Sequence, residues 1–422
     1  MNGRSIAKLS LVALVLTATV GISPALAKKA EETAVGGYKL TRSVQSSIAQ
    51  AQDALQAGDA ITALAQIQNA EARIRTEDDR YVTNMVKYNA AVQAGRTVMA
   101  NEAIAALVAA NRVPPADMAK LLVAQGKAVR LVDHRRAETI FAQAARMKPD
   151  DGDILVMLAG SQAENGKPAE AVATMARAIA AKKAAGQAAP ESWYTRAVAI
   201  ANDGKLVDQT SDAAQALVTA YPSAENWHDA VTLSRMLVTD TGTKLDLLRL
   251  ARATGGLRGE SEYLDYAAAA TAAGYAGEAK AVLAEGAQRN ILDKTATPPK
   301  AKGKAPAKAP ATVAQSALPG LVKQAKASAT GKAAMTAADA ALSFGDYAQA
   351  AELYRLALSK GGVDTATANT RLGIALARSG DKVGAAQVLA QVTGPRAAAA
   401  KLWTAYTGQQ GSLAQATPPA AP

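Results

Sequence analysis

The sequence predicts an all-α protein, an α-solenoid of about nine stacked helical hairpins interrupted by one disordered linker. The chain of 422 residues contains 105 alanines but only 16 aromatic residues, a composition that favours helices packed closely together. The sustained alternation of apolar and polar residues typical of a half-buried sheet is absent. A joint spacing of glycine, alanine and one bulky apolar residue recurs along the chain. Together these observations favour repeated helical hairpins.

The first 27 residues have the pattern of a secretory signal peptide. Arg4 and Lys8 form a basic start, an apolar run covers residues 9–22, and an Ala-Leu-Ala motif ends at Ala27. The alternative is an uncleaved anchor, but this run is short against the ~20 residues that span a bilayer. We expect cleavage after Ala27 and a periplasmic or secreted mature protein. The chain has no cysteine, which excludes disulfides and thiolate sites.

The repeating unit is clearest at residues 345–358. Gly345 ends one helix in a turn, and Ala350, Tyr354 and Ala357 then share one face of the next helix. A small residue five positions after the turn glycine and a bulky apolar residue nine positions after it recur at five other glycines. These are Gly58, Gly95, Gly166, Gly274 and Gly380.

Three further turns fit this frame less well. Gly204 is a weaker instance, Val132 stands where a glycine is expected, and a degenerate turn is predicted near Gly242. The turns from residue 58 to residue 204, and those at 345 and 380, follow one another at intervals of 34 to 38 residues. A small residue also recurs seven positions before the turn. This residue and the period together resemble the tetratricopeptide repeat (TPR), a helical hairpin of ~34 residues. The resemblance covers most of residues 44–292 and 329–395.

The resemblance implies how the hairpins are used. One hairpin cannot bury its own apolar face, so stacked hairpins bury their faces against each other. The family implies a right-handed superhelix whose groove is lined mainly by the first helix of each hairpin. Such grooves bind proteins or peptides.

Composition divides the chain into five regions. These are a signal peptide (1–27), an N-terminal TPR-like array (28–293), a Lys/Pro/Ala-rich linker (294–312), a C-terminal TPR-like pair with a capping helix (313–410) and a disordered tail (411–422). The linker has four prolines, five lysines and no large apolar residue, so it is predicted to be an extended spacer. The alternative is that its lysines contact anionic envelope polymers or lipid headgroups. Leu402, Trp403 and Tyr406 are expected to cover the last hairpin.

The net charge argues against nucleic-acid binding. The formal charge of +11 falls to +9 without the signal segment, and the five linker lysines contribute more than half of that excess. A nucleic-acid-binding protein concentrates basic residues on a folded face instead. We therefore expect no specific nucleic-acid partner.

The sequence contains no recognised catalytic or metal-binding motif. HExxH, GxSxG and phosphate-binding glycine motifs are absent, and the two histidines, His134 and His228, lie far apart. A base role for either is the alternative to a surface or capping role. We expect no enzyme activity, no cofactor and no metal site.

The family frame identifies candidate partner-binding residues. Variable first-helix positions are expected near Gln52, Gln56, Asn89, Gln93 and Arg130, which suggests a polar groove for an extended peptide. The carboxylate clamp of chaperone-tail-binding TPR domains is disfavoured, because only Asn89 and Arg130 resemble it.

Aromatic residues gather in the middle of the chain, where Trp193 fills a packing position of the repeat and Trp227 is the candidate exposed aromatic. Such residues form either a core or a binding platform. The predicted function is a non-catalytic periplasmic TPR scaffold or adaptor in envelope assembly or traffic. The alternative is a polysaccharide- or peptidoglycan-binding envelope module that uses the central aromatics and the linker lysines.

Overall fold

The computed structural model describes residues 34–35, 37–112, 115–293, 295–297 and 313–413. The predicted signal peptide, most of the predicted linker and nearly all of the predicted tail lie outside these ranges. The chain forms two compact units, Met1–Gln187 and Ala188–Pro422. This division lies inside the predicted N-terminal array (28–293), and residues 313–413 share the second unit with the helices that precede the linker.

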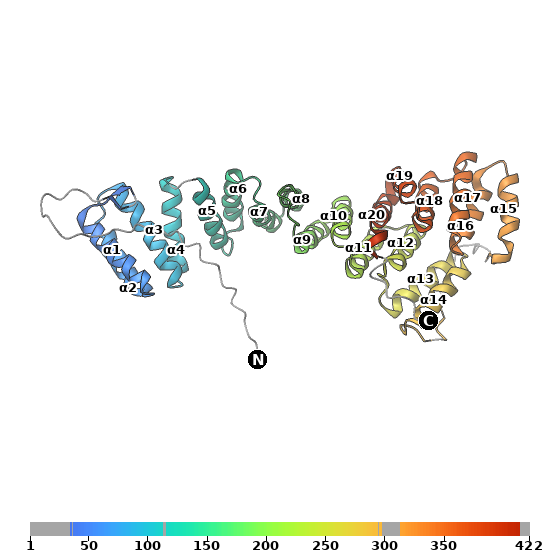
Figure 1. The fold of residues 1–422 in the computed structure, drawn as a ribbon, viewed down its shortest axis with the longest axis horizontal. Helices are drawn as coiled ribbons and strands as arrows, with labels where there is room; N and C mark the ends of the chain where they lie inside the picture. Colours follow the sequence, from blue (N-terminus) through green and yellow to red (C-terminus); the bar gives the residue numbers. More distant parts are fainter. Residues whose placement is uncertain (1–33, 36, 113–114, 294, 298–312, 414–422) are drawn as a thin grey trace. The chain divides into compact units, whose positions relative to one another are not determined.

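The first unit contains four helical hairpins and one short strand pair (Figure 1). The strands β1 (Ala34–Val35) and β2 (Tyr38–Lys39) are antiparallel, with Ala34 opposite Lys39. The hairpins are α1 (Arg42–Gln56) with α2 (Ala60–Glu71), α3 (Glu77–Gln93) with α4 (Thr97–Ala110), α5 (Pro115–Val129) with α6 (His134–Met147), and α7 (Gly152–Glu164) with α8 (Pro168–Ala184).

The second unit contains five hairpins, two single helices and two short 3-10 segments. Before the linker come α9 (Glu191–Asp203) with α10 (Val207–Ala220), α11 (Ala224–Leu237) with α12 (Thr241–Thr254), and α13 (Glu260–Ala272) with α14 (Ala276–Gln288). After it come η1 (Gln315–Ala317), α15 (Leu318–Ala327), α16 (Gly331–Ser343) with α17 (Tyr347–Lys360), α18 (Thr365–Ser379) with α19 (Lys382–Leu389), η2 (Gly394–Arg396) and α20 (Ala397–Leu413). The nine hairpins of the described residues confirm the predicted all-α solenoid.

The turn glycines adopt the conformation that the repeat requires. All six glycines of the clear repeats have positive φ, between 68° and 95°. The other two turns are displaced: Gly204 has a φ of −75° and Lys205 takes the left-handed position, while Gly242 lies within the first turn of α12. The α11–α12 turn therefore spans residues 238–240, a few residues before the predicted point.

Small residues bring the paired helices into contact. Seven positions before and five after the turn glycine, every small residue is buried, whereas Tyr88 before Gly95 is half-buried. The buried ones are Ala51, Ala63, Ala100, Ala159, Ala171, Ala267, Ala279, Ala338, Ala350, Gly373 and Ala385. At Gly373 the helices approach too closely for a Cβ, because an added Cβ would lie 2.4 Å from Cγ of Leu389. Alanine at these positions both favours the helix and allows close packing.

Polar side chains at the helix starts define the hairpin boundaries. Thr76 accepts a hydrogen bond from the Asp79 backbone N–H at 3.0 Å, and the Asp79 carboxylate accepts one from the Thr76 backbone N–H at 3.1 Å. Such a capping box satisfies two otherwise unpaired donors. Single aspartates cap seven more helices: Asp59, Asp133, Asp151, Asp240, Asp346, Asp364 and Asp381. Each cap stabilises its helix by about 1 kcal/mol.

The C-terminal helix α20 makes more contacts than the sequence predicted. It packs against α18 and α19, and it also packs against α10 and α12, which precede the linker (Figure 1). Trp403 is fully buried, and its indole Nε1 donates a hydrogen bond to the Asp246 carbonyl oxygen at 3.1 Å. Helix α20 therefore covers the last hairpin, as expected, and it also joins the two halves of this unit.

Candidate functional site

The first helices of the first unit carry polar residues at one repeated position. Four residues lie two positions before the turn glycine or its replacement: Gln56, Gln93, Arg130 and Glu164. We refer to these four residues as the turn-end row. Three of them are among the predicted groove residues, and Glu164 completes the set by the same count.

An ion pair shows that equivalent positions lie side by side. Arg130 Nε lies 2.8 Å from Oε2 of Glu164, and Arg130 NH2 binds Oε1 of the same carboxylate. Because Arg130 directly follows the end of α5 and Glu164 ends α7, the C-terminal ends of successive first helices meet at this position. His134 Nδ1 lies 3.1 Å from Glu164 Oε2. The hydrogen bond from Arg130, which is the largest influence, lowers the pKa of Glu164.

The other end of the row consists of amides. Gln56 and Gln93 are exposed, and Gln52 and Asn89 lie one helical turn earlier and are half-buried. None of these four side chains hydrogen-bonds to another described residue. Each amide has donors and an acceptor available. This surface can therefore pair with both the N–H and C=O groups of an extended backbone.

Trp227 is not an exposed aromatic residue. Its side chain is 0% exposed within the core of the second unit, and its Nε1 has no hydrogen-bond partner among the described residues. The displaced α11–α12 turn explains the wrong prediction. Trp227 lies 13 residues before Asp240, the N-cap of α12, just as Trp193 lies 13 residues before Leu206, the N-cap of α10. Both tryptophans therefore occupy the same packing position of the repeat.

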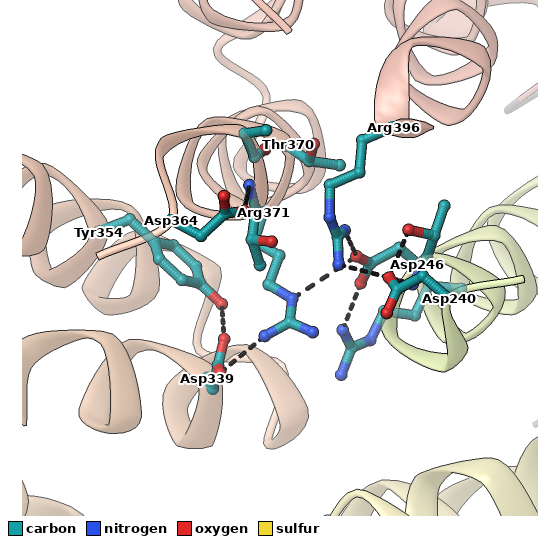
Figure 2. Close-up of polar contacts among 12 residues, drawn as sticks. Asp240, Asp246, Asp339, Tyr354, Asp364, Thr370, Arg371 and Arg396 are labelled. Carbon is teal, nitrogen blue, oxygen red and sulfur yellow. Dashed lines mark hydrogen bonds and ion pairs between the residues drawn. The ribbon is translucent and has the colours of Figure 1, made fainter. Parts of the chain in front are cut away.

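A buried cluster of charged residues lies in the second unit around Asp246, and no sequence pattern predicted it. Asp246 on α12 is 0% exposed, and its Oδ1 lies 2.8 Å from NH1 of Arg249. Its Oδ2 accepts a hydrogen bond from NH1 of Arg396 at 2.9 Å and lies 3.5 Å from Nε of Arg371 (Figure 2). Burial is the largest influence and opposes ionisation, but Arg371, Arg249 and Arg396 together keep the pKa of Asp246 below its ordinary 3.8.

Each arginine of the cluster also has a second acidic partner. Arg249 binds both carboxylate oxygens of Glu278, at 2.8 and 2.7 Å. The other two partners are Asp339, 2.7 Å from Arg371, and Asp240, 2.9 Å from Arg396. Figure 2 shows Arg371 between Asp339 and Asp246, with Arg396 reaching Asp246 from the other side.

This pairing of opposite charges indicates the role of the cluster. A buried charge is tolerated when opposite charges and hydrogen bonds compensate it. Here the cluster ties α12 to α14, α16, α18 and η2. We therefore assign it a structural role in joining the helices on either side of the linker.

The hollows of the described surface are shallow. One of about 230 Å³ lies on α9–α11 and is mainly apolar, with Leu217, Leu233 and Met236 in its lining. Another of about 310 Å³ lies on α2–α4, where Lys87 binds Glu71 at 2.8 Å. Within the described ranges, no group of three histidine or acidic side chains is placed to hold a metal ion, and no helix is both long and apolar enough to span a bilayer.

Part of the first unit is similar to a known repeat family. Residues 122–189, covering most of α5 to α8, match the sequence model of the tetratricopeptide repeat. No curated protein matches the chain. A tetratricopeptide repeat protein from Parabacteroides merdae is 10% identical with a TM-score of 0.33, over 80% of this chain and 100% of that one.

Two similar structures come from protein complexes. A chain of the APC/C hetero-tetramer Cut9-Hcn1 is 13% identical with a TM-score of 0.26, over 78% of this chain and 56% of that one. A chain of Naa15/Naa10 bound to HypK-THB is 14% identical with a TM-score of 0.20, over 84% of this chain and 70% of that one.

The fold defines a class of protein built from stacked helical hairpins. Residues 122–189 match the tetratricopeptide repeat, and most of the other hairpins of the described residues share its turn geometry. This fold supports a role as a protein-interaction scaffold.

Proposed function

We propose that this chain is an exported, non-catalytic scaffold that binds a protein or peptide through the first helices of its first unit. Its place would be the bacterial periplasm, in the assembly or traffic of envelope proteins or polymers. The pattern of residues 1–27 supports export. The repeat fold supports the scaffold role.

The turn-end row carries this proposal. An extended partner segment lying along it would meet the amides of Gln56 and Gln93 and then the ion pair of Arg130 with Glu164. The amides recognise backbone groups, and the ion pair offers both charges to polar side chains. Such a surface suits extended segments of varied sequence.

The polysaccharide-binding alternative loses its main support. It depends on exposed central aromatics and above all on Trp227, but both central tryptophans, Trp193 and Trp227, are buried. One part of that alternative remains a proposal: the linker lysines make a weak contact with anionic envelope polymers.

Site-specific photo-crosslinking in the native envelope tests the proposal. A photo-reactive residue at position 56 or 93 is expected to capture the same partner. The matched control is position 69 on α2, where exposed Asn69 bonds only to Gln66 among described residues. Purified partner is expected to bind the Asn89→Ala/Arg130→Ala variant about tenfold or more weakly, since each lost hydrogen bond costs about 1 kcal/mol and those of charged groups cost more. Equal capture at position 69, or unchanged affinity of that variant, would contradict the proposal.

A further inference from the structure

The α5–α6 turn differs from the other hairpin turns of the first unit. Residues 130–133 join α5 to α6, so this turn has four residues, whereas each of the other three has three. Val132 stands at the glycine position, and none of the four residues has positive φ. The departure from the repeat changes the surface at this point.

The turn exposes two adjacent aliphatic side chains. Leu131 is 83% exposed and Val132 is 86% exposed, the highest values among the large apolar side chains of the described residues. Val98, at the start of α4, is also largely exposed on the same turn edge of the array. These side chains contribute little to packing, so folding alone does not explain them. Adjacent exposed apolar residues commonly mark interaction sites.

Basic residues lie within five positions of this pair in sequence, on both sides of it. Lys127, Arg135 and Arg136 are exposed, and none forms an ion pair with a described residue. The acidic groups nearby are already engaged. Glu164 is bound to Arg130 and His134, and the Asp133 carboxylate accepts a hydrogen bond from the Arg136 backbone N–H at 2.9 Å. The turn therefore combines an apolar tip with uncompensated positive charge.

We propose that the α5–α6 turn contacts the surface of a bilayer containing anionic phospholipids. Leu131 and Val132 enter the boundary between headgroups and acyl chains, and Lys127, Arg135 and Arg136 bind lipid phosphates. Long basic side chains extend toward the headgroups while apolar neighbours enter the bilayer. An anionic bilayer can accept exposed apolar side chains that have basic neighbours, because it needs no shaped pocket on the protein.

The contact is weak and reversible. Each basic residue near an anionic surface raises the partition coefficient about fivefold, and salt screens this attraction. Two aliphatic side chains add about tenfold or more. The bilayer contact adjoins Arg130 of the turn-end row, but the Leu131→Ser/Val132→Ser variant changes no residue of that row, so either proposal can fail alone.

Vesicle co-sedimentation of the mature chain, residues 28–422, tests this inference. The probes are vesicles of phosphatidylcholine alone and of phosphatidylcholine mixed with phosphatidylglycerol. We expect salt-sensitive binding to the mixed vesicles. Leu131→Ser/Val132→Ser is expected to weaken it about tenfold or more. Arg135→Gln/Arg136→Gln is expected to weaken it about 25-fold.

Two control variants separate this turn from other sources of binding. Val383→Ser removes an aliphatic side chain that is 69% exposed next to Lys382 in the second unit, and it should bind as the unchanged chain does. A variant with the five linker lysines replaced by glutamine should keep most of the binding. The inference is overturned if the mature chain does not bind the mixed vesicles. It is also overturned if Leu131→Ser/Val132→Ser binds as tightly as the unchanged chain. If the linker variant then loses binding, the linker lysines are the source of the contact.

Discussion

Replacing Asp246 by alanine is expected to lower the free energy of unfolding of the second unit by about 3–5 kcal/mol. The carboxylate is completely buried and touches three guanidinium groups, on Arg249, Arg371 and Arg396. Removing it leaves positive charges in the core with one acidic partner fewer. The loss is large because buried charges cannot regain water without opening the packed helices.

Urea unfolding followed by circular dichroism measures this loss. The control is Asp212→Ala, because Asp212 pairs with Lys401 but is 59% exposed, and an exposed pair contributes at most about 1 kcal/mol. Since the pKa of Asp246 is lowered, its stabilising contribution is present above pH 3.8 and is lost as the pH falls through the folded-state pKa. Asp246→Asn should lack this acid-dependent loss. A cost below about 1 kcal/mol for Asp246→Ala would contradict the structural role of the cluster.

Replacing Trp403 by alanine is expected to cost about 3–5 kcal/mol and to loosen α20 from α10 and α12. The indole is fully buried, packs edge-to-face on Tyr406 with ring centroids 5.4 Å apart, and bonds to the Asp246 carbonyl. Truncation leaves a cavity where α20 meets the helices that precede the linker. It also removes a neighbour of the charge cluster.

Amide hydrogen exchange of residues 397–409 measures this loosening. Faster exchange there, with little change in α13 and α14, is the expected pattern. Trp403→Phe keeps much of the buried ring but loses the hydrogen bond, so its cost should be smaller. Unchanged exchange of α20 in Trp403→Ala would show that other contacts hold the helix.

Much of the fold could be predicted because the repeat is local. Turn glycines with positive φ, alanines at helix contacts and aspartate caps all act within about forty residues. The period therefore located nearly every hairpin. It failed at the α11–α12 turn, where no glycine occupies residues 238–240 and Gly242 lies inside the helix. That displacement led to the wrong prediction for Trp227.

The charge cluster could not be predicted for a different reason. Asp246 and Arg249 lie on the same helix, but the other two partners of Asp246, Arg371 and Arg396, lie 125 and 150 residues away in sequence. A repeat period carries no information about such distant pairs. Charged residues also usually face water, so burial was not the expected outcome.

The candidate surface was predicted in part. The repeat frame identified Gln56, Gln93 and Arg130 as first-helix positions, and the same count identifies Glu164 once the hairpins are known to stack. Whether these residues bind a partner stays a prediction. The exposure of Leu131 and Val132 also required the structure, because a turn residue can either fold back or project.

Chemical crosslinking of α20 to α10 tests the organisation of the second unit most directly. The chain has no cysteine, so the variant Asp212→Cys/Lys401→Cys carries only the two introduced thiols. The native side chains at these positions are in contact. A short thiol-reactive bifunctional reagent should join them within one chain. The control is Lys323→Cys/Lys401→Cys, since Lys323 lies on α15, which packs on α16.

Efficient joining of positions 212 and 401, with little joining of positions 323 and 401, is the predicted result. It would show that the chain beyond the linker returns to the helices before it. No joining of positions 212 and 401 in the folded protein would contradict this arrangement, and the charge cluster could not then tie the two halves together.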